Sequence, residues 1–147
     1  MNTQPQNQQH DIDVRMRTMR ILWFAFIVSV GMYYVFTLFA NRRPNPTPNN
    51  TLSLTFIAVS ASMLLVSFLL KHKLLNRAID QQQVGLVQQA YIVALALAEV
   101  PALLGMLDLF VTGNRYYYVL MIIAAGIQLL HFPRREHVES AAFRRTI

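Results

Sequence analysis

The sequence predicts an all-α protein, an integral membrane four-helix bundle with both termini in the cytoplasm. Composition is the first reason, because 54% of the residues are hydrophobic and 14% are charged, whereas soluble domains are about 25% charged. The position of the charges is the second, since only Glu99 and Asp108 fall inside long apolar stretches. A chain of 147 residues forms one compact unit, and four such stretches exceed what its core could bury in water. A lipid bilayer accommodates all four.

The first predicted span follows a polar segment. Residues 1–20 are expected to form a cytoplasmic tail, whose first ten residues are rich in Gln and Asn and are expected to be disordered. Asp11–Arg20 is expected to be a frayed entry to the first helix. Ile21–Ala40 has no charge over 20 residues, enough to cross about 30 Å of hydrocarbon as a helix. Arginines before an apolar stretch also occur in signal peptides, but Leu38–Ala40 lacks the small-x-small cleavage pattern. We therefore expect an uncleaved helix.

A proline-rich loop separates the first span from the second. Asn41–Asn50 has proline at positions 44, 46 and 48, a spacing that excludes a helix and favours an extended loop. Leu52–Leu70 is the predicted second span, and the polar stretch Lys71–Gln89 follows it. Within that stretch, Asp80 and Gln83 have the spacing of a helix N-terminus. We expect the third helix to begin there, outside the membrane.

The third and fourth spans are predicted to be antiparallel neighbours. The third is Ala90–Thr112 and the fourth is Tyr116–Phe132. Only Gly113–Arg115 separates them, and so short a connection is a tight turn. The transmembrane domain is thus expected to cover residues 21–132, with residues 133–147 as a basic cytoplasmic tail.

The distribution of Lys and Arg predicts the orientation. The N-terminal tail carries three, the polar stretch between the second and third spans three, and the C-terminal tail four. The opposite side carries three, two in the proline-rich loop and Arg115. Because basic residues favour the cytoplasmic side, both termini are expected inside, in a bacterial inner (plasma) membrane. Basic residues that flank spans, and do not form one stripe, also argue against nucleic-acid binding.

Glu99 is the acidic residue at mid-membrane depth. It stands about nine residues into the third span, roughly 14 Å from the inner interface, where a charge costs at least about 2.5–3.5 kcal/mol. Ser29 and Ser60 lie at the same depth on the first two spans and could bond a neutral carboxyl. Pro101 lacks the N–H that would bond the Leu97 carbonyl, which leaves a free acceptor within a turn of Glu99. Glu99 is thus either a link between helices or, with Ser60, Ser29 and Pro101, a proton or cation site.

Small and hydroxyl-bearing residues of the spans predict close helix packing. The face of the third helix opposite Glu99 carries mostly small side chains: Ala94, Ala98, Pro101, Gly105 and Asp108. The second span repeats serine every seventh residue, at Ser53, Ser60 and Ser67. Gln128 on the fourth span is a further candidate for an interhelical hydrogen bond.

Asp108 is expected to have a local role. It follows Glu99 by nine residues, so the two side chains lie about 180° apart around the helix and do not share one route. Asp108 is close to the outer surface, where Arg115, Arg42 or Arg43 could reach it. We therefore expect an ion pair there.

No catalytic constellation is found. The chain has no cysteine, which removes disulfides, thiolate metal sites and cysteine nucleophiles. His131 and His137 are six residues apart with no third ligand evident, so no metal site is expected. The sequence also lacks a nucleophile elbow, a glycine-rich phosphate loop and an HExxH pair. We therefore expect neither an enzyme nor a bound cofactor.

The stretch Leu75–Asn114 resembles the second half of the c subunit of rotary ATP synthases, the proteolipid. The shared features are Arg77 in the inferred cytoplasmic loop and Glu99 within the segment Ala96–Gly105. The resemblance implies that Glu99 corresponds to the proton-carrying carboxylate of that family. The chain departs from the family because Leu52–Leu70 has no glycine, whereas the family's first helix is glycine-rich, and because two further spans flank the hairpin.

Three classes of function follow from these features. The leading hypothesis is a multi-pass membrane protein without catalysis, an accessory or scaffold component that binds a membrane-protein partner or a second copy of itself. The alternative is proteolipid-like translocation of protons or cations through Glu99. The third is one half of a dimeric small-molecule transporter. A Glu99 that stays neutral favours the first hypothesis, and a Glu99 that titrates favours the second.

Overall fold

The chain is represented by a computed structural model that describes residues 4–40 and 49–142. Within these residues every regular element is a helix. The helices are α1 (Gln4–Ala40), α2 (Asn50–Asp80), α3 (Val84–Thr112), α4 (Tyr118–Leu130) and α5 (Arg135–Ala142). The predicted all-α helical bundle is confirmed. The prolines of the predicted loop, with Arg42 and Arg43, lie outside the described residues.

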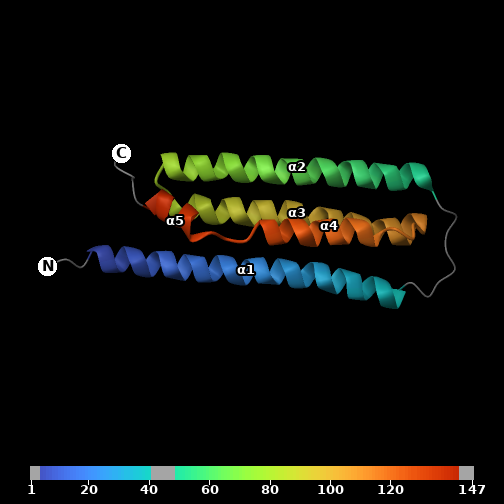
Figure 1. Cartoon of the computed structure of the whole chain (residues 1–147), viewed down its shortest axis with the longest axis horizontal. Coiled ribbons are helices and arrows are strands. Elements are labelled where there is room, and N and C mark those ends of the chain that lie inside the picture. The colour runs from blue at the N-terminus through green and yellow to red at the C-terminus, as the bar shows by residue number, and fades with distance from the viewer. Residues whose placement is uncertain (1–3, 41–48, 143–147) are drawn as a thin grey trace.

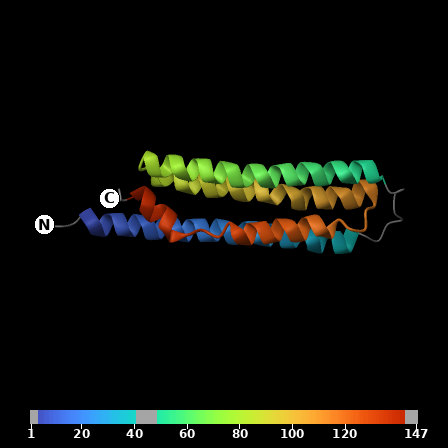
Figure 2. The ribbon, with the colours of Figure 1, turned by 45° about the horizontal axis from the view of Figure 1, so that its top comes forward.

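The four longer helices lie nearly parallel to one axis, and successive helices run in opposite directions (Figure 1). α2 packs against α3, while α1 packs against both α3 and α4. Figure 2 shows these two pairs, with α2 beside α3 and α1 beside α4. α1 and α2 do not contact each other in the part of the chain that the structure describes. α3 is therefore the central helix.

Three helices, α1, α2 and α3, are long and apolar enough to cross a membrane. α4 has 13 residues, or about 20 Å of helix, and is shorter than the predicted span 116–132. Large apolar side chains point outward from these helices, including Phe24, Phe39 and Leu69, which are 61%, 70% and 71% exposed. Such surfaces are unfavourable in water and normal against acyl chains, so they are those of a membrane protein.

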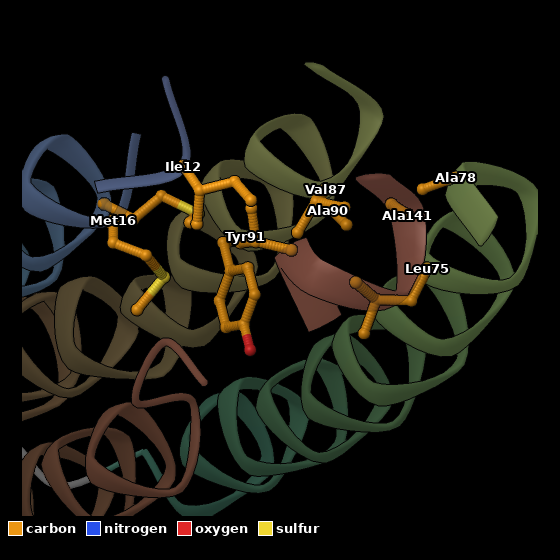
Figure 3. Packing of buried hydrophobic residues seen from close by; sticks show 10 residues of the cluster. Ile12, Met16, Leu75, Ala78, Val87, Ala90, Tyr91 and Ala141 are labelled. Atoms are coloured by element: carbon orange, nitrogen blue, oxygen red, sulfur yellow. The ribbon is translucent and has the colours of Figure 1, made fainter. Parts of the chain in front are cut away.

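Both predicted tails contain more helix than expected. α1 begins at Gln4, so residues 4–20 continue the helix of the first span. α5 lies inside the predicted tail 133–147. The physical reason is a shared apolar core that we call the end cluster: Ile12, Met16, Met19, Leu75, Ala78, Val87, Ala90, Tyr91, Val138 and Ala141. Figure 3 shows that its side chains come from α1, α2, α3 and α5.

The third helix does begin within the polar stretch, as predicted, but at Val84 and not at Asp80. α2 continues through Asp80, and α3 begins at Val84 after a three-residue turn. Gln82 turns the chain with a φ of 50°, and the Gln83 side chain makes no capping hydrogen bond. α2 extends past its apolar stretch because Leu75 and Ala78 are buried in the end cluster. Most of the predicted polar loop is therefore helix.

The face of small residues on α3 is buried. Ala94, Ala98, Pro101, Gly105 and Asp108 all lie in the interior. A Cβ atom at Gly105 would lie 2.8 Å from the carbonyl oxygen of Tyr117, so only glycine permits this approach to the start of α4. A second apolar core, the central cluster, lies along this contact and comprises Val30, Ala102, Leu109, Tyr117, Met121 and Ala124.

Candidate functional site

Glu99 links α3 to α1. Its Oε1 atom accepts hydrogen bonds from the Ser29 hydroxyl and from the Tyr33 hydroxyl, the latter at 2.8 Å. Ser29 and Tyr33 are four residues apart and therefore lie on one face of α1, one turn from each other. The carboxyl is half-buried at this contact. The Ser29–Glu99 hydrogen bond expected from their common depth is present.

Tyr33 was not among the predicted partners of Glu99. A comparison of depths places Tyr33 one helical turn away from Glu99, and a short side chain there would not reach the carboxyl. The tyrosine side chain is long enough to cross that distance. The four-residue spacing of Ser29 and Tyr33 is the signal that could have identified it.

The hydrogen bonds of Glu99 fit a neutral or an ionised carboxyl. Among the described residues, Ser29 and Tyr33 donate to Oε1. In a neutral acid, Oε1 would be the carbonyl oxygen and Oε2 would carry the proton. In an ionised acid, the two donors would stabilise the negative charge. The chemistry available here is therefore a hydrogen-bonded link between α1 and α3.

Ser60 does not join Glu99. Ser53 pairs with Asp108 and Ser67 with Ala94 across the antiparallel helices, so Ser60 lies opposite Pro101. Glu99 and Pro101 are about 200° apart around α3, and α1 and α2 approach different faces. Ser60 is buried, and its hydroxyl has no hydrogen-bond partner within the described residues. The predicted site is thus divided. Glu99 faces α1, whereas Pro101 faces Ser60 of α2 from the other side of α3.

Asp108 is bonded to neutral donors. Its carboxylate accepts hydrogen bonds from Ser53 at 2.6 Å, Thr112 at 2.6 Å and Asn114 at 2.7 Å. Within the described residues it has no ion pair, and Arg115 instead lies 5.1 Å from the Tyr116 ring centre. The expected pair with Arg115 is therefore wrong, because burial places Asp108 beside donors on α2 and in the α3–α4 turn. Arg42 and Arg43 are outside the described residues.

A third polar contact joins α2, α3 and α4. The Ser67 hydroxyl donates to the Ala94 carbonyl at 2.8 Å and lies 3.2 Å from Nε2 of His131. Nδ1 of His131 lies 2.8 Å from the Ile127 carbonyl, which can only accept. In a neutral His131, Nδ1 therefore carries the proton and Nε2 is an acceptor. The single hydroxyl proton of Ser67 then has two possible acceptors, the Ala94 carbonyl and Nε2 of His131.

Gln128 is buried without the predicted interhelical hydrogen bond. Neither its amide nitrogen nor its amide oxygen has a partner within the described residues. Its backbone carbonyl accepts a hydrogen bond from Nε1 of Trp23 at 2.8 Å, which ties α4 to α1. No group of three or more His, Asp or Glu side chains that could hold a metal lies in the described part of the chain.

Comparison with protein-family models, with curated proteins and with solved structures gives no match to this chain. The resemblance of Leu75–Asn114 to the rotary proteolipid therefore stays a prediction from the residues that carry it. Function is best inferred from the three polar contacts centred on Glu99, Asp108 and Ser67.

Proposed function

We propose that this chain is a membrane protein without catalytic activity that serves as an accessory or scaffold component of a larger membrane assembly. Its partner would be another membrane protein or a second copy of the chain. The observation that carries the proposal is the use of its deep polar side chains as links between helices.

Each of these links joins different helices. Glu99 joins α3 to α1 through Ser29 and Tyr33. Asp108 joins α3 to α2 through Ser53, and His131 lies at the contact of α4 with α2. Interhelical hydrogen bonds stabilise membrane bundles by about 0.6–2 kcal/mol each. Polar side chains used in this way hold the helices in fixed positions, as a scaffold requires.

The outward face of α2 supports a partner-binding role. It exposes a stripe of small side chains at helical spacing: Thr51, Thr55, Ala58 and Ser62. The Thr55 and Ser62 hydroxyls donate to backbone carbonyls of α2 itself, at 3.0 and 2.9 Å, so they need no lipid-side partner. Small residues allow close approach of another membrane helix. Since α2 packs chiefly on α3, this face is available to one.

The proposed topology has four spans with both termini in the cytoplasm of a bacterial inner membrane. Ten of the 13 basic residues would then lie inside. α1 begins and α5 ends at the same end of the bundle, as this topology requires (Figure 1). The 13-residue α4 would cross the bilayer because the flanking turn at Tyr116–Tyr117 and the segment that ends at Pro133 add to its length. A short span is accommodated by local thinning of the bilayer.

A second candidate function is translocation of protons or cations through Glu99. The observation that favours it is the partial exposure of this carboxyl at the middle of a membrane helix. Asp108 is fully buried and accepts three hydrogen bonds, so it is less suited to exchange a proton. A proton or cation must be able to enter and leave a carrier site. The partly exposed Glu99 would allow this better than the buried Asp108.

The variant Glu99→Gln separates the two candidates. Gln keeps the side-chain volume and the acceptor oxygen, so a structural Glu99 should tolerate it with a change in unfolding free energy of about 1 kcal/mol or less. An amide cannot carry a proton near neutral pH. Proton flux into proteoliposomes and thermal unfolding in detergent should be measured for both proteins. We expect no flux from either protein and nearly equal stability.

Glu99→Leu is the matched control, because it removes the acceptor and leaves the Ser29 and Tyr33 hydroxyls unpaired. We expect it to cost about 1–3 kcal/mol of stability. Wild-type flux that disappears in a folded Glu99→Gln protein would overturn the scaffold proposal in favour of the carrier.

A further inference from the structure

A groove of about 460 Å³ opens between α1 and the start of α5. One wall is a single face of α1 that includes Asp13, Arg17, Arg20 and Phe24, and the other wall is Arg135. The α1 residues recur at steps of three and four, so their side chains stand above one another along the helix. The groove is thus a strip that runs lengthwise along the bundle.

The charge of this groove is positive and only partly compensated. Arg135 pairs with Asp13 at 3.3 Å and with Glu139 at 2.7 Å. Arg17 and Arg20 are exposed and form no ion pair in the described part of the chain. All seven Asp and Glu residues of the sequence lie in that part. The groove therefore has three arginines against one aspartate, and two of the arginines lack a carboxylate partner.

The order of side chains along the groove follows depth in a bilayer. Arg20 is the last charged residue before the 20 uncharged residues of Ile21–Ala40. Its guanidinium therefore belongs at the level of the lipid phosphates. Ile21 and Phe24 continue the same groove on the apolar side and are 59% and 61% exposed. Cationic side chains are thus followed directly by exposed apolar ones.

We propose that this groove binds one anionic glycerophospholipid, with its phosphate between Arg17 and Arg20 and its acyl chains along Ile21 and Phe24. A phospholipid has the same order of chemistry, an anionic phosphodiester joined to apolar chains. Arginine forks bind phosphate oxygens in pairs, and basic pockets between membrane helices bind anionic headgroups.

The test uses the full chain purified in an uncharged detergent and three probes: phosphatidylglycerol, phosphatidylcholine and inorganic phosphate. Binding is measured by native mass spectrometry and by the shift of the thermal unfolding temperature. We expect phosphatidylglycerol to bind and stabilise the protein, and the other two probes to have little effect. Each of Arg17→Gln and Arg20→Gln should weaken phosphatidylglycerol binding about 5-fold, and the double variant about 30-fold.

The matched control is the double variant Lys73→Gln, Arg77→Gln, which removes the same charge from exposed positions on α2 outside the groove. Its affinity for phosphatidylglycerol should stay within about 2-fold of the wild type. Circular dichroism checks that all variants keep their helical content. The proposal is overturned if the control loses as much affinity as the groove variant or if the groove variant binds normally. Equal binding of phosphatidylcholine, or equal stabilisation by inorganic phosphate, would overturn it as well.

Discussion

The end cluster and the central cluster both include residues of α1 and α3, but they differ in their surroundings. The end cluster buries large apolar groups, among them Ile12, Met16 and Tyr91, where the helices extend beyond their apolar stretches. The central cluster includes two alanines and lies beside Gly105. Around it, the deep polar contacts of Glu99 and Asp108 link the helices. Both clusters thus combine large side chains with alanines, and the central one adds the close approach at Gly105 and these interhelical hydrogen bonds.

This difference would follow from a placement of the apolar stretches in a membrane, with the end cluster in water and the central cluster in lipid. Burial of apolar surface from water stabilises by roughly 25 cal/mol per Å², so large side chains favour association at the polar end. Lipid tails are as apolar as leucine, so excluding lipid from between two helices contributes little free energy to their association. Helices in lipid associate through close packing and interhelical hydrogen bonds instead. The two clusters should therefore respond to different substitutions.

The largest effect is expected in the end cluster. Val138 is fully buried there, so Val138→Asp places a carboxylate among apolar side chains. We expect a loss of about 3–5 kcal/mol in the free energy of unfolding. Thermal unfolding in detergent, followed by circular dichroism, measures the loss.

Val14→Asp is the matched control for this prediction. Val14 lies on α1 and is 49% exposed, so its replacement should change stability by no more than about 0.5 kcal/mol. Equal losses from the two variants would mean that the end cluster is not a packed core.

A smaller effect is expected in the central region. Gly105→Ala brings a Cβ atom to 2.8 Å from the Tyr117 carbonyl and 3.1 Å from Cβ of Leu120. Because backbone cannot move as easily as a side-chain tip, we expect a loss of about 1–3 kcal/mol. Gly105→Leu and Ala98→Leu should be worse. The measurement is again thermal unfolding in detergent.

Two substitutions serve as controls for the central region. A Cβ atom at Gly126 would meet nothing within 4 Å, so Gly126→Ala should leave stability unchanged or slightly higher. Leu103→Ile keeps the volume at a 36% exposed position and should be mild. If Gly105→Ala were as mild as Gly126→Ala, close packing of α3 on α4 would not matter for stability.

The smallest effect is expected from pH at the end cluster. Burial, together with the nearby cations Lys71 and Arg134, lowers the pKa of His137, and Glu136 opposes this change. Nδ1 of His137 is 2.6 Å from the Tyr91 hydroxyl, which already accepts a bond from the Arg134 backbone N–H at 3.1 Å. The Tyr91 hydroxyl thus links α3 to both His137 and Arg134.

The sign of the pH effect follows from this pKa. An unfolded chain protonates His137 near pH 6.5, whereas the folded chain does so only at lower pH. Stability is then complete above about pH 6.5 and is lost as the pH falls below it, by about 1 kcal/mol at most for a half-buried ring. Unfolding measured from pH 7.5 to 5.5 checks this. His137→Gln should flatten the response, and His72→Gln, at an exposed position, should not.

The sequence predicted the fold better in the apolar stretches than in the polar ones. Hydrophobic length identified α1, α2 and α3, and helical angles identified the buried face with Ala98 and Gly105. α5 was missed, and Asp11–Arg20 was predicted only as a frayed helix entry, because both are held by contacts distant in sequence, such as those of Val138 and Ile12 in the end cluster. The 3.6-residue spacing of Ile12, Met16 and Met19 was visible, but its partners were not.

The candidate site was predicted in part. The common depth of Ser29 and Glu99 was enough to anticipate their hydrogen bond. Depth alone does not say which face of a helix a neighbour meets, so Ser60 was also placed with Glu99 although it lies opposite Pro101. For Asp108, the negative charge led to the prediction of an arginine partner. The buried side chain instead accepts hydrogen bonds from the neutral donors Ser53 and Thr112. Rotation of helices about their axes is the quantity that one sequence does not fix.

The position of α5 has a consequence for the order of assembly. α5 follows the other four helices along the chain and packs against α1, α2 and α3. During synthesis, Ile12 and Met16 are made long before Val138, so their apolar surface lacks its last packing partner until α5 is made. Completion of the end cluster then joins the earliest segment to the latest one. Until that step, the nascent protein presents the exposed apolar surface that chaperones and proteases recognise.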